Sequence, residues 1–442
     1  MTTKTVGSTS PQVTKSKLVL LITLGVLGLV GYGAFLYFLF LKHASLPAMV
    51  AVLIALGCLV IVRQLTPQKR REVILGYLYL LPAMTFLFTF SFFPVAYAMY
   101  ISLHKWRIKK QAYLGLGNYR HALGEPSGVI TFLVGCLLLL AAWWVSQQDI
   151  WSERNRLVRI ALVGLLLLGG LALLVVGVPI MGKTGDPDLW NSLKVTLYYV
   201  IGTVPIQLAI SLVLAYLLFQ KIKGKTTFRM IYFLPYVTSL VASSSVWAKL
   251  FNPRGGLFNR ILQAVGLPAL RWLQEPRGIG VLLFGPDIPS WAAGPSLAQV
   301  AVLIFVIWFW IGYDTTIFLA GLGNIPNELY EAARIDGANG WDLFRHITLP
   351  LLSPTTFFLT LVAVIGSFKA FAHIFVMTST ASGGVVGGPI KTNMTAAIFI
   401  YNTFYTNVRN GYASAIAFIL FALILAITLF QNYYSKKWVF YS

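Results

Sequence analysis

The sequence predicts an all-α, polytopic membrane protein, and three observations support this fold class. Hydrophobic residues make up 57% of the 442 residues, charged residues make up only 11%, and the mean hydropathy is +0.76. Soluble domains usually contain about 25% charged residues, so the charges present here are too few to cover several globular surfaces. The apolar runs are also continuous, whereas the strands of a membrane β-barrel alternate apolar and polar residues.

A bilayer core about 30 Å thick requires about 20 apolar residues in a helical span. About ten segments of the chain meet this requirement by hydropathy, and the second and the fourth are the shortest. In chain order, the candidate spans are 18–41, 46–62, 73–103, 129–145, 158–181, 192–219, 228–249, 297–320, 348–377 and 413–433.

Short basic loops set the orientation of these spans. The chain carries 34 Lys and Arg against 13 Asp and Glu, which gives a net charge of +21. When the spans are counted through, one side of the membrane receives the short basic segments 69–71, 154–159, 221–229 and 436–437. The positive-inside rule makes this side the cytoplasm and places both termini there.

One basic segment opposes this assignment, because Lys105, Arg107, Lys109 and Lys110 fall on the outer side. Elsewhere the basic residues lie mostly at the ends of apolar runs, where they anchor helices and meet anionic lipid. The basic residues are therefore expected to contact the membrane surface, and nucleic-acid binding is not expected.

A polar segment at 323–350 differs in composition from the rest of the chain. Pro326 suits the first turn of a helix. Leu329, Ala332 and Ala333 then follow at the spacing of one helical face, which predicts a short amphipathic helix. The segment is cytoplasmic in the topology above.

The second half of this segment suggests contact with another protein. Gly337 and Gly340 interrupt the helix, and a second apolar face begins beyond them. Small residues let a partner backbone approach closely, and charged side chains at the rim can pair across an interface. The apolar residues are Trp341, Leu343, Phe344 and Ile347, and the charged ones are Glu331, Arg334 and Asp336. The alternative is a surface helix that only joins two spans.

The spacing within this segment resembles a known motif. Glu331-Ala332-Ala333, then Gly337, then nine residues before Ile347-Thr348-Leu349-Pro350 resemble the EAA loop. This loop is characteristic of permease subunits of binding-protein-dependent ABC importers. Further segments resemble the carbohydrate-uptake branch, the maltose and glycerol-3-phosphate type, and they are 77–82, 115–119, 191–196, 228–236, 251–259 and 411–415.

The resemblance implies a six-helix ABC-importer permease core plus about four additional transmembrane helices. Residues 1–72 are expected to hold two of the added helices, and residues 73–442 the permease domain. Within that domain we expect an inserted helix pair at about 129–181 and the coupling loop at 323–350. The loop 251–296, rich in Gly and Pro, is expected to fold as a small lid.

The resemblance also implies two sets of site residues. The expected contact with an ATPase is made by Glu331, Ala332, Ala333, Arg334, Asp336, Gly337, Ile347, Leu349 and Pro350. The expected substrate path is lined by Tyr313, Gly366, Ser367, Lys369, Ala370 and Phe371.

Several residues in or near the expected substrate path allow a second interpretation. Ser367 and Phe371 lie four residues apart, so on one helix they share a face. Lys369 can instead snorkel or pair with Asp314, the only acid well inside a predicted span. Trp308, Trp310 and Tyr313 can stack on sugar rings, or face lipid and packing neighbours. Ala372 stands where relatives often carry a polar residue, and His373 is unusual there and is expected to be structural.

No His, Cys or acid cluster predicts a metal site. Gly177 and Gly182-Lys183-Thr184 have the spacing of a phosphate loop, but they end an apolar span instead of following a strand, so no phosphate loop is expected. The chain is therefore expected to have no catalytic residues, to bind no cofactor and to leave ATP and Mg to a partner. The resemblance implies a bacterial inner-membrane complex with a second permease, an ATPase dimer and an extracytoplasmic sugar-binding protein, besides membrane lipid.

Two other classes of protein remain as alternatives. A secondary transporter driven by an ion gradient requires intramembrane acids, and Asp314 is thin support for it. A membrane-bound enzyme such as a lipid-linked glycosyltransferase calls for an acidic cluster in an outer loop, where the acids of this chain are scattered.

Overall fold

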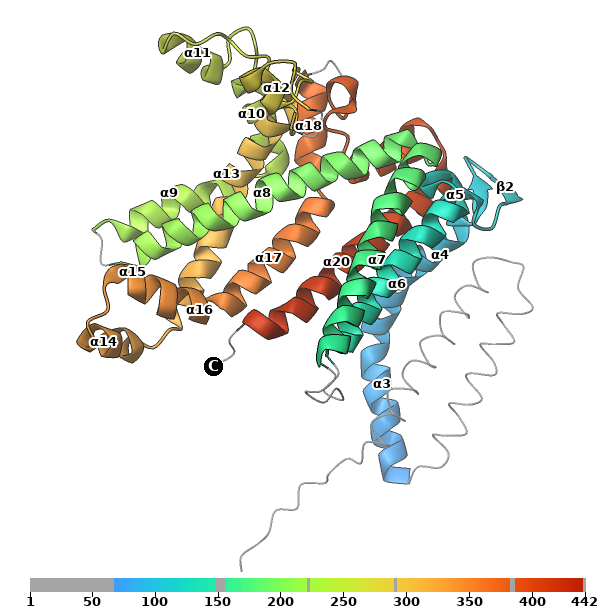
Figure 1. Cartoon of the computed structure of the whole chain (residues 1–442), viewed down its shortest axis with the longest axis horizontal. Helices are drawn as coiled ribbons and strands as arrows, with labels where there is room; N and C mark the ends of the chain where they lie inside the picture. The colour runs from blue at the N-terminus through green and yellow to red at the C-terminus, as the bar shows by residue number, and fades with distance from the viewer. Residues whose placement is uncertain (1–66, 148–155, 221–222, 290–291, 382–385, 440–442) are drawn as a thin grey trace, which may run out of the picture. The chain divides into compact units, whose positions relative to one another are not determined.

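The computed structural model describes residues 67–147, 156–220, 223–289, 292–381 and 386–439 (Figure 1). The chain divides into two compact units, Met1–Tyr100 and Ile101–Ser442, whereas the sequence placed a boundary after residue 72. The first two predicted spans, 18–41 and 46–62, lie outside the described residues.

The described part of the first unit is a helical segment that continues into the second. It consists of α3 (Pro67–Leu87), the π-helical turn η1 (Phe88–Phe92) and α4 (Phe93–Ser102). Pro94 has no N–H to donate to the preceding turn, and the wide π turn lies directly before it.

A short hairpin and helix open the second unit. Strands β1 (His104–Trp106) and β2 (Lys110–Tyr113) pair antiparallel and are followed by α5 (Gly117–Leu123). The Asn118 side chain donates hydrogen bonds to the carbonyl oxygens of Ser102 and His104, at 2.7 and 3.0 Å. These bonds fix the hairpin to α5.

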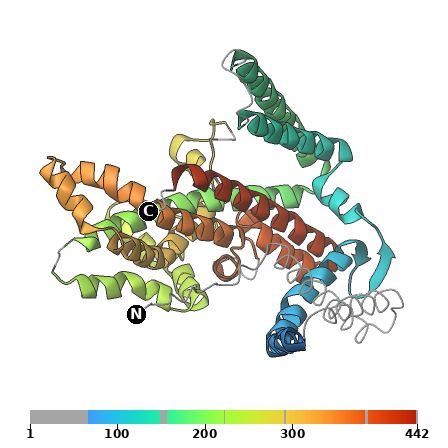
Figure 2. The ribbon, with the colours of Figure 1, turned by 90° about the horizontal axis from the view of Figure 1, so that it is seen from below.

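Two long helices occupy the range in which the sequence predicts an inserted pair. They are α6 (Pro126–Ser146) and α7 (Arg156–Thr184), which lie side by side in Figures 1 and 2. We call them the inserted hairpin. A Cβ added at Gly135 would lie 3.0 Å from the Gly170 carbonyl oxygen, so glycine permits this close packing. Trp143 of α6 donates a hydrogen bond to the Tyr433 hydroxyl, which ties the hairpin to the final helix.

The core of the second unit is built on two long helices, α8 (Pro187–Phe219) and α13 (Leu297–Gly323), packed against each other. Helices α17 (Ser353–Phe368) and α19 (Ala396–Tyr401) pack on α8. The final helix, α20 (Asn410–Trp438), packs on both of them. The largest fully buried side chains include Tyr199, Phe305, Phe318, Leu352, Leu359 and Ile398.

Two of the predicted spans are bent. Span 228–249 forms α9 (Lys225–Val237) and α10 (Leu240–Leu250), which meet at 96°. Segment Gly340–Leu351 meets Ser353–Phe368 at 62°, inside the range predicted as the single span 348–377. Within the described ranges, six helices are long and apolar enough to cross a membrane, or eight if each bent pair counts as one span.

The remaining elements are short. At one end of the core these are α11 (Leu257–Ala264), α12 (Ile279–Phe284), α18 (Ala372–Ala381), η4 (Pro389–Lys391) and η5 (Asn402–Thr406). At the opposite end are α14 (Asn327–Ile335), α15 (Gly340–Asp342), the π-helix η3 (Leu343–Thr348) and α16 (Leu349–Leu351).

The loop expected to form a lid contains a small aromatic core that continues into the hydrophobic core of the second unit. Phe251 stacks on Phe258 with ring centroids 4.6 Å apart, and Trp272 covers both rings. The buried Asn259 amide holds this core together. It donates to the carbonyl oxygens of Pro253 and Leu270, and it accepts from the Leu270 N–H and the Trp272 indole, all at 2.9–3.2 Å.

Replacing Asn259 by Ala is expected to loosen the lid without affecting the membrane helices. Each neutral hydrogen bond contributes about 1 kcal/mol net, and the orphaned Leu270 and Trp272 groups add to the loss, so local stability should fall by about 2–4 kcal/mol. Hydrogen exchange over residues 251–275 should accelerate. Gln263→Ala, an exposed change on the same helix α11, is the matched control. Equal exchange rates in the two variants would contradict this role of Asn259.

Candidate functional site

The segment that the sequence assigns to an ATPase contact projects from the core as an exposed helix. Helix α14 has no buried residue, and we call it the coupling helix. Its apolar Leu329 and Ile335 are exposed, the latter to 87%. An apolar side chain this exposed on a short helix suits a groove in a partner protein.

Gly337 ends the coupling helix in a conformation that favours glycine. Its φ is +85°, in the left-handed region, and a Cβ added there would meet no atom within 4 Å. Asn339 then caps the next turn, accepting hydrogen bonds from the N–H groups of Trp341 and Asp342. The sequence interpretation that Gly337 interrupts the helix agrees with this geometry.

The π-helix η3 connects the coupling helix to the core. The Tyr330 hydroxyl lies 3.0 Å from the hydroxyl of the buried Thr348. Phe344 packs edge-on against Tyr216 of α8 at a centroid distance of 4.9 Å. Trp341, expected on a second apolar face, is 64% exposed, so only the remainder of that face packs inward.

The residues assigned to the ATPase contact share the cytoplasmic surface of this segment in the predicted topology. Within the part of the chain that the structure describes, none of their charged groups forms an ion pair. The exposed members are Glu331, Ala332, Arg334, Asp336, Gly337 and Leu349, and the half-buried ones are Ala333, Ile347 and Pro350.

A cavity of about 370 Å³ lies among α8, α13 and α17, and we call it the central cavity. Every residue that the sequence assigns to the substrate path lines it: Tyr313, Gly366, Ser367, Lys369, Ala370 and Phe371. Trp310 lines it as well, whereas Trp308 packs against Trp247 with ring centroids 4.9 Å apart.

The expectation that Ser367 and Phe371 share one helix face is wrong. Helix α17 ends at Phe368, Lys369 caps it, and a new helix begins at Ala372. Both residues reach the central cavity because the chain bends away from α17 there. The break also leaves backbone polar groups at the cavity, and the Ala370 carbonyl accepts a hydrogen bond from the Thr395 hydroxyl at 3.2 Å.

Polar side chains from α8 form one wall of the central cavity. The Ser367 hydroxyl lies 3.3 Å from that of Thr203, and the Tyr199 hydroxyl lies 2.7 Å from Nε2 of His373. His373 is buried and lines the cavity, beyond the structural role expected for it. Gln207 completes this wall.

Asp314 and Lys369 both line the cavity but form no ion pair with each other, so the pairing considered from the sequence is absent. Asp314 is only 3% exposed, and its Oδ2 has no hydrogen-bond partner among the described residues. Aromatic rings lie beside these groups, since Tyr236 contacts Trp310 and Tyr313 at centroid distances of 5.5 and 5.0 Å. The cavity therefore offers both ring faces and hydrogen-bonding groups.

The contribution of α8 was not predicted from the sequence. The signal was present, because polar residues recur every three or four positions along an otherwise apolar helix. Such a stripe marks one helix face, and all of its members are buried: Ser192, Thr196, Tyr199, Thr203, Gln207 and Ser211.

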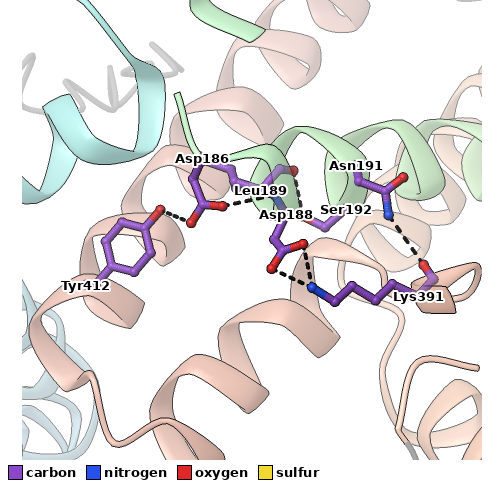
Figure 3. A network of polar contacts seen from close by, with 7 residues as sticks. All are labelled: Asp186, Asp188, Leu189, Asn191, Ser192, Lys391 and Tyr412. Carbon is purple, nitrogen blue, oxygen red and sulfur yellow. Dashed lines mark hydrogen bonds and ion pairs between the residues drawn. The ribbon is translucent and has the colours of Figure 1, made fainter. Parts of the chain in front are cut away.

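A polar network closes the N-terminal end of α8 (Figure 3). Asp186 caps the helix by accepting from the Asp188 N–H at 2.9 Å, and its other oxygen accepts from the Tyr412 hydroxyl at 2.6 Å. Lys391 lies 2.6 Å from both carboxylate oxygens of Asp188. The network joins the start of α8 to η4 and to the start of α20, so it holds three segments together at the first turn of the cavity-lining helix.

Residues 188–439 match the family described as binding-protein-dependent transport system inner membrane component. The match covers more than half of the chain and contains both the coupling helix and the central cavity. The chain belongs to this family. The inserted hairpin and the first unit precede the matched range.

Curated relatives agree with this family. A probable ABC transporter permease of Pyrococcus horikoshii is 34% identical over 252 residues, which cover 57% of this chain and 78% of the relative. The lactose permease LacF of Rhizobium radiobacter is 31% identical, over 57% and 78%. The sn-glycerol-3-phosphate permease UgpA of Brucella abortus is 33% identical, over 58% and 79%. These relatives support a permease subunit of an ABC importer over the ion-gradient-driven alternative.

The fold itself is similar to a solved one. A bacterial ABC transporter involved in the import of the acidic polysaccharide alginate matches with a TM-score of 0.56 at 18% identity, covering 84% of this chain and 98% of that chain. This is the fold of an ABC-importer permease. The apolar helices and the family match make the chain a multi-pass membrane protein. In the described ranges, no three His, Cys, Asp or Glu side chains group as metal ligands.

Proposed function

We propose that this chain is the permease of an ATP-driven importer for a sugar or sugar derivative and forms its translocation path. The observation that carries the proposal is the connectivity of the site. The coupling helix follows directly on α13, and η3 and α16 lead directly into α17. Both α13 and α17 line the central cavity. A displacement of the coupling helix therefore acts on two cavity walls at once.

The composition of the cavity supports a sugar as cargo. Sugars present polar edges and apolar ring faces, which suit hydrogen-bonding groups beside aromatic rings. Trp310 and Tyr313 supply the rings, and Ser367 and Gln207 supply hydrogen-bonding groups. The relatives named for lactose and sn-glycerol-3-phosphate are consistent with this class.

The mechanism we propose uses the coupling helix as a lever. Exposed Ile335 and the neighbouring charges would dock in an ATPase dimer, which binds ATP and Mg. Closure of the ATPases would displace α14, and α13 and α17 would rock so that the central cavity changes from inward-facing to outward-facing. A second permease would complete the path, and an extracytoplasmic binding protein would deliver the sugar. The chain would lie in the bacterial inner membrane with both termini cytoplasmic.

The test is reconstitution of the tagged full chain with the proteins that co-purify with it. Proteoliposomes should take up a radiolabelled sugar only with ATP and the binding protein present, and Ile335→Asp should abolish co-purification of the ATPase. Leu283→Asp is the matched control, because Leu283 is also apolar, is 70% exposed and lies in the predicted outer lid. Uptake driven by a proton or sodium gradient without ATP would contradict the proposal.

A further inference from the structure

The basic outer segment that opposes the topology rule contributes to a second cavity. This cavity has a volume of about 390 Å³, and cationic residues from two separate regions of the chain line it. Lys105 and Arg107 come from the hairpin β1–β2, and Arg409 comes from the residue that precedes α20. His121 of α5 also lines it. We call it the outer basic cavity.

Hydrogen bonds and close packing hold the walls of the outer basic cavity in place. Asn118 fixes α5 to the backbone of His104, as described above. The Asn410 side chain donates to the Arg107 carbonyl oxygen at 3.1 Å. A Cβ added at Gly411 would lie 2.1 Å from the His104 carbonyl oxygen, so α20 packs directly on β1. The cavity is therefore formed by the fold before any ligand binds.

Among the residues that the structure describes, no acidic side chain forms an ion pair with the charges that line this cavity, which are those of Lys105, Arg107 and Arg409. The Arg409 guanidinium instead lies over the Tyr412 ring, 4.7 Å from its centroid. The nearby Asp186 does not line the cavity, and it already accepts a hydrogen bond from the Tyr412 hydroxyl. An anion is the ligand that these groups can bind.

The position of the cavity along the chain sets its depth in the membrane. The apolar helix that ends at Ser102 leads into the hairpin, and the apolar helices that begin at Pro126 and Asn410 lead away from it. The cavity thus lies where three membrane spans end, at the boundary between lipid and water. The predicted topology makes this the extracytoplasmic boundary.

The surroundings of the cavity are apolar and exposed. Ile108 at the hairpin tip is 82% exposed and Leu116 is 70% exposed, with Tyr113 and Leu114 beside them. A soluble anion does not bury these apolar side chains and gains nothing from them. An anionic phospholipid suits both features, because its headgroup binds cationic side chains while its acyl chains cover apolar side chains.

We propose that the outer basic cavity binds the phosphate headgroup of an anionic phospholipid from the outer leaflet. Lys105, Arg107 and Arg409 contact the phosphate, and the acyl chains pass along Leu114 and Leu116. The lipid accounts for the basic residues on the side where the topology rule does not place them. It also bridges β1–β2 and the start of α20.

The test uses the purified full chain in nanodiscs of phosphatidylcholine with a minor share of phosphatidylglycerol. The protein is released from the nanodiscs in the mass spectrometer, and native mass spectrometry identifies the lipids that stay bound to it. The double variant Lys105→Gln/Arg107→Gln should retain phosphatidylglycerol with about 25-fold lower affinity, since each cation near an anionic headgroup contributes about fivefold. The matched control is Lys109→Gln/Lys110→Gln, which removes the same charge from the same hairpin outside the cavity lining. The control should retain phosphatidylglycerol as the unmodified chain does.

Further arms identify the source of the anion. Excess inorganic phosphate or a soluble sugar acid should not displace the lipid, and phosphatidylcholine should not replace it. Displacement by inorganic phosphate or a sugar acid would overturn the lipid assignment in favour of a soluble anion. Equal lipid loss in both double variants would show general charge attraction, and no loss in Lys105→Gln/Arg107→Gln would also overturn the proposal. Arg409→Gln should weaken retention independently of the hairpin.

Discussion

Replacing Gly337 by Asp is expected to abolish transport and sugar-stimulated ATP hydrolysis, while the chain still inserts and folds. The site has room for a side chain, because a Cβ there meets no atom within 4 Å, and Asp tolerates the left-handed region better than most residues. In the proposed complex, however, the added carboxylate enters the ATPase contact without a partner. An unpaired charge at such an interface costs about 3 kcal/mol, which weakens the association about a hundredfold.

The measurement is ATPase co-purification together with uptake by proteoliposomes. Gly266→Asp is the matched control, since Gly266 has a φ of +79° and equally open surroundings in the outer lid. That variant should assemble and transport normally. Full transport by Gly337→Asp would show that the segment is only a connector. An equal loss of assembly and transport in the two variants would mean that the strained backbone, and not the contact with the ATPase, causes the loss.

Hydropathy predicted where the chain crosses the membrane better than how each span is shaped. Each of the eight predicted spans within the described ranges corresponds to an apolar helix or a bent helix pair. The bend after α9 was not predicted, because a run of apolar residues carries no information on where its backbone turns. The structure shows the local cause. Ser239 caps the new helix α10 by accepting a hydrogen bond from the Ala242 N–H, and Pro235 and Thr238 lie at the end of the preceding helix.

The site was predictable where local spacing determines structure and less so where distant segments meet. The apolar spacing before Gly337 predicted a helix, and α14 occupies that segment. The positions Gly366, Ser367, Lys369, Ala370 and Phe371 were assigned through resemblance to a family, and they lie together at one cavity. Tyr199 and His373 lie 174 residues apart in sequence, so their contact depends on the packing of α8 against the broken helix α17–α18. The short strands of β1–β2 have too few residues to show a period of two.

Replacing Ser367 by Leu is expected to abolish uptake while leaving the coupling helix intact. Ser367 is 7% exposed, lines the central cavity, and lies 3.3 Å from the Thr203 hydroxyl. Leucine fills part of the cavity and presents no hydrogen-bonding group to a sugar. The space that leucine takes up excludes the sugar, and a loss of more than about 1.4 kcal/mol of binding free energy should lower uptake by more than about tenfold. Assembly with the ATPase and basal ATP hydrolysis should persist.

Ser367→Ala separates the two causes, because it removes the hydroxyl but keeps the space. The loss of one neutral hydrogen bond, about 1 kcal/mol, should weaken sugar affinity about fivefold or less. Radiolabelled sugar uptake measured over a range of concentrations distinguishes the variants, since the alanine change should raise KM and the leucine change should remove uptake at every concentration. Unchanged uptake kinetics in Ser367→Leu would place this side chain against protein or lipid, because a blocked path cannot carry its cargo at the normal rate.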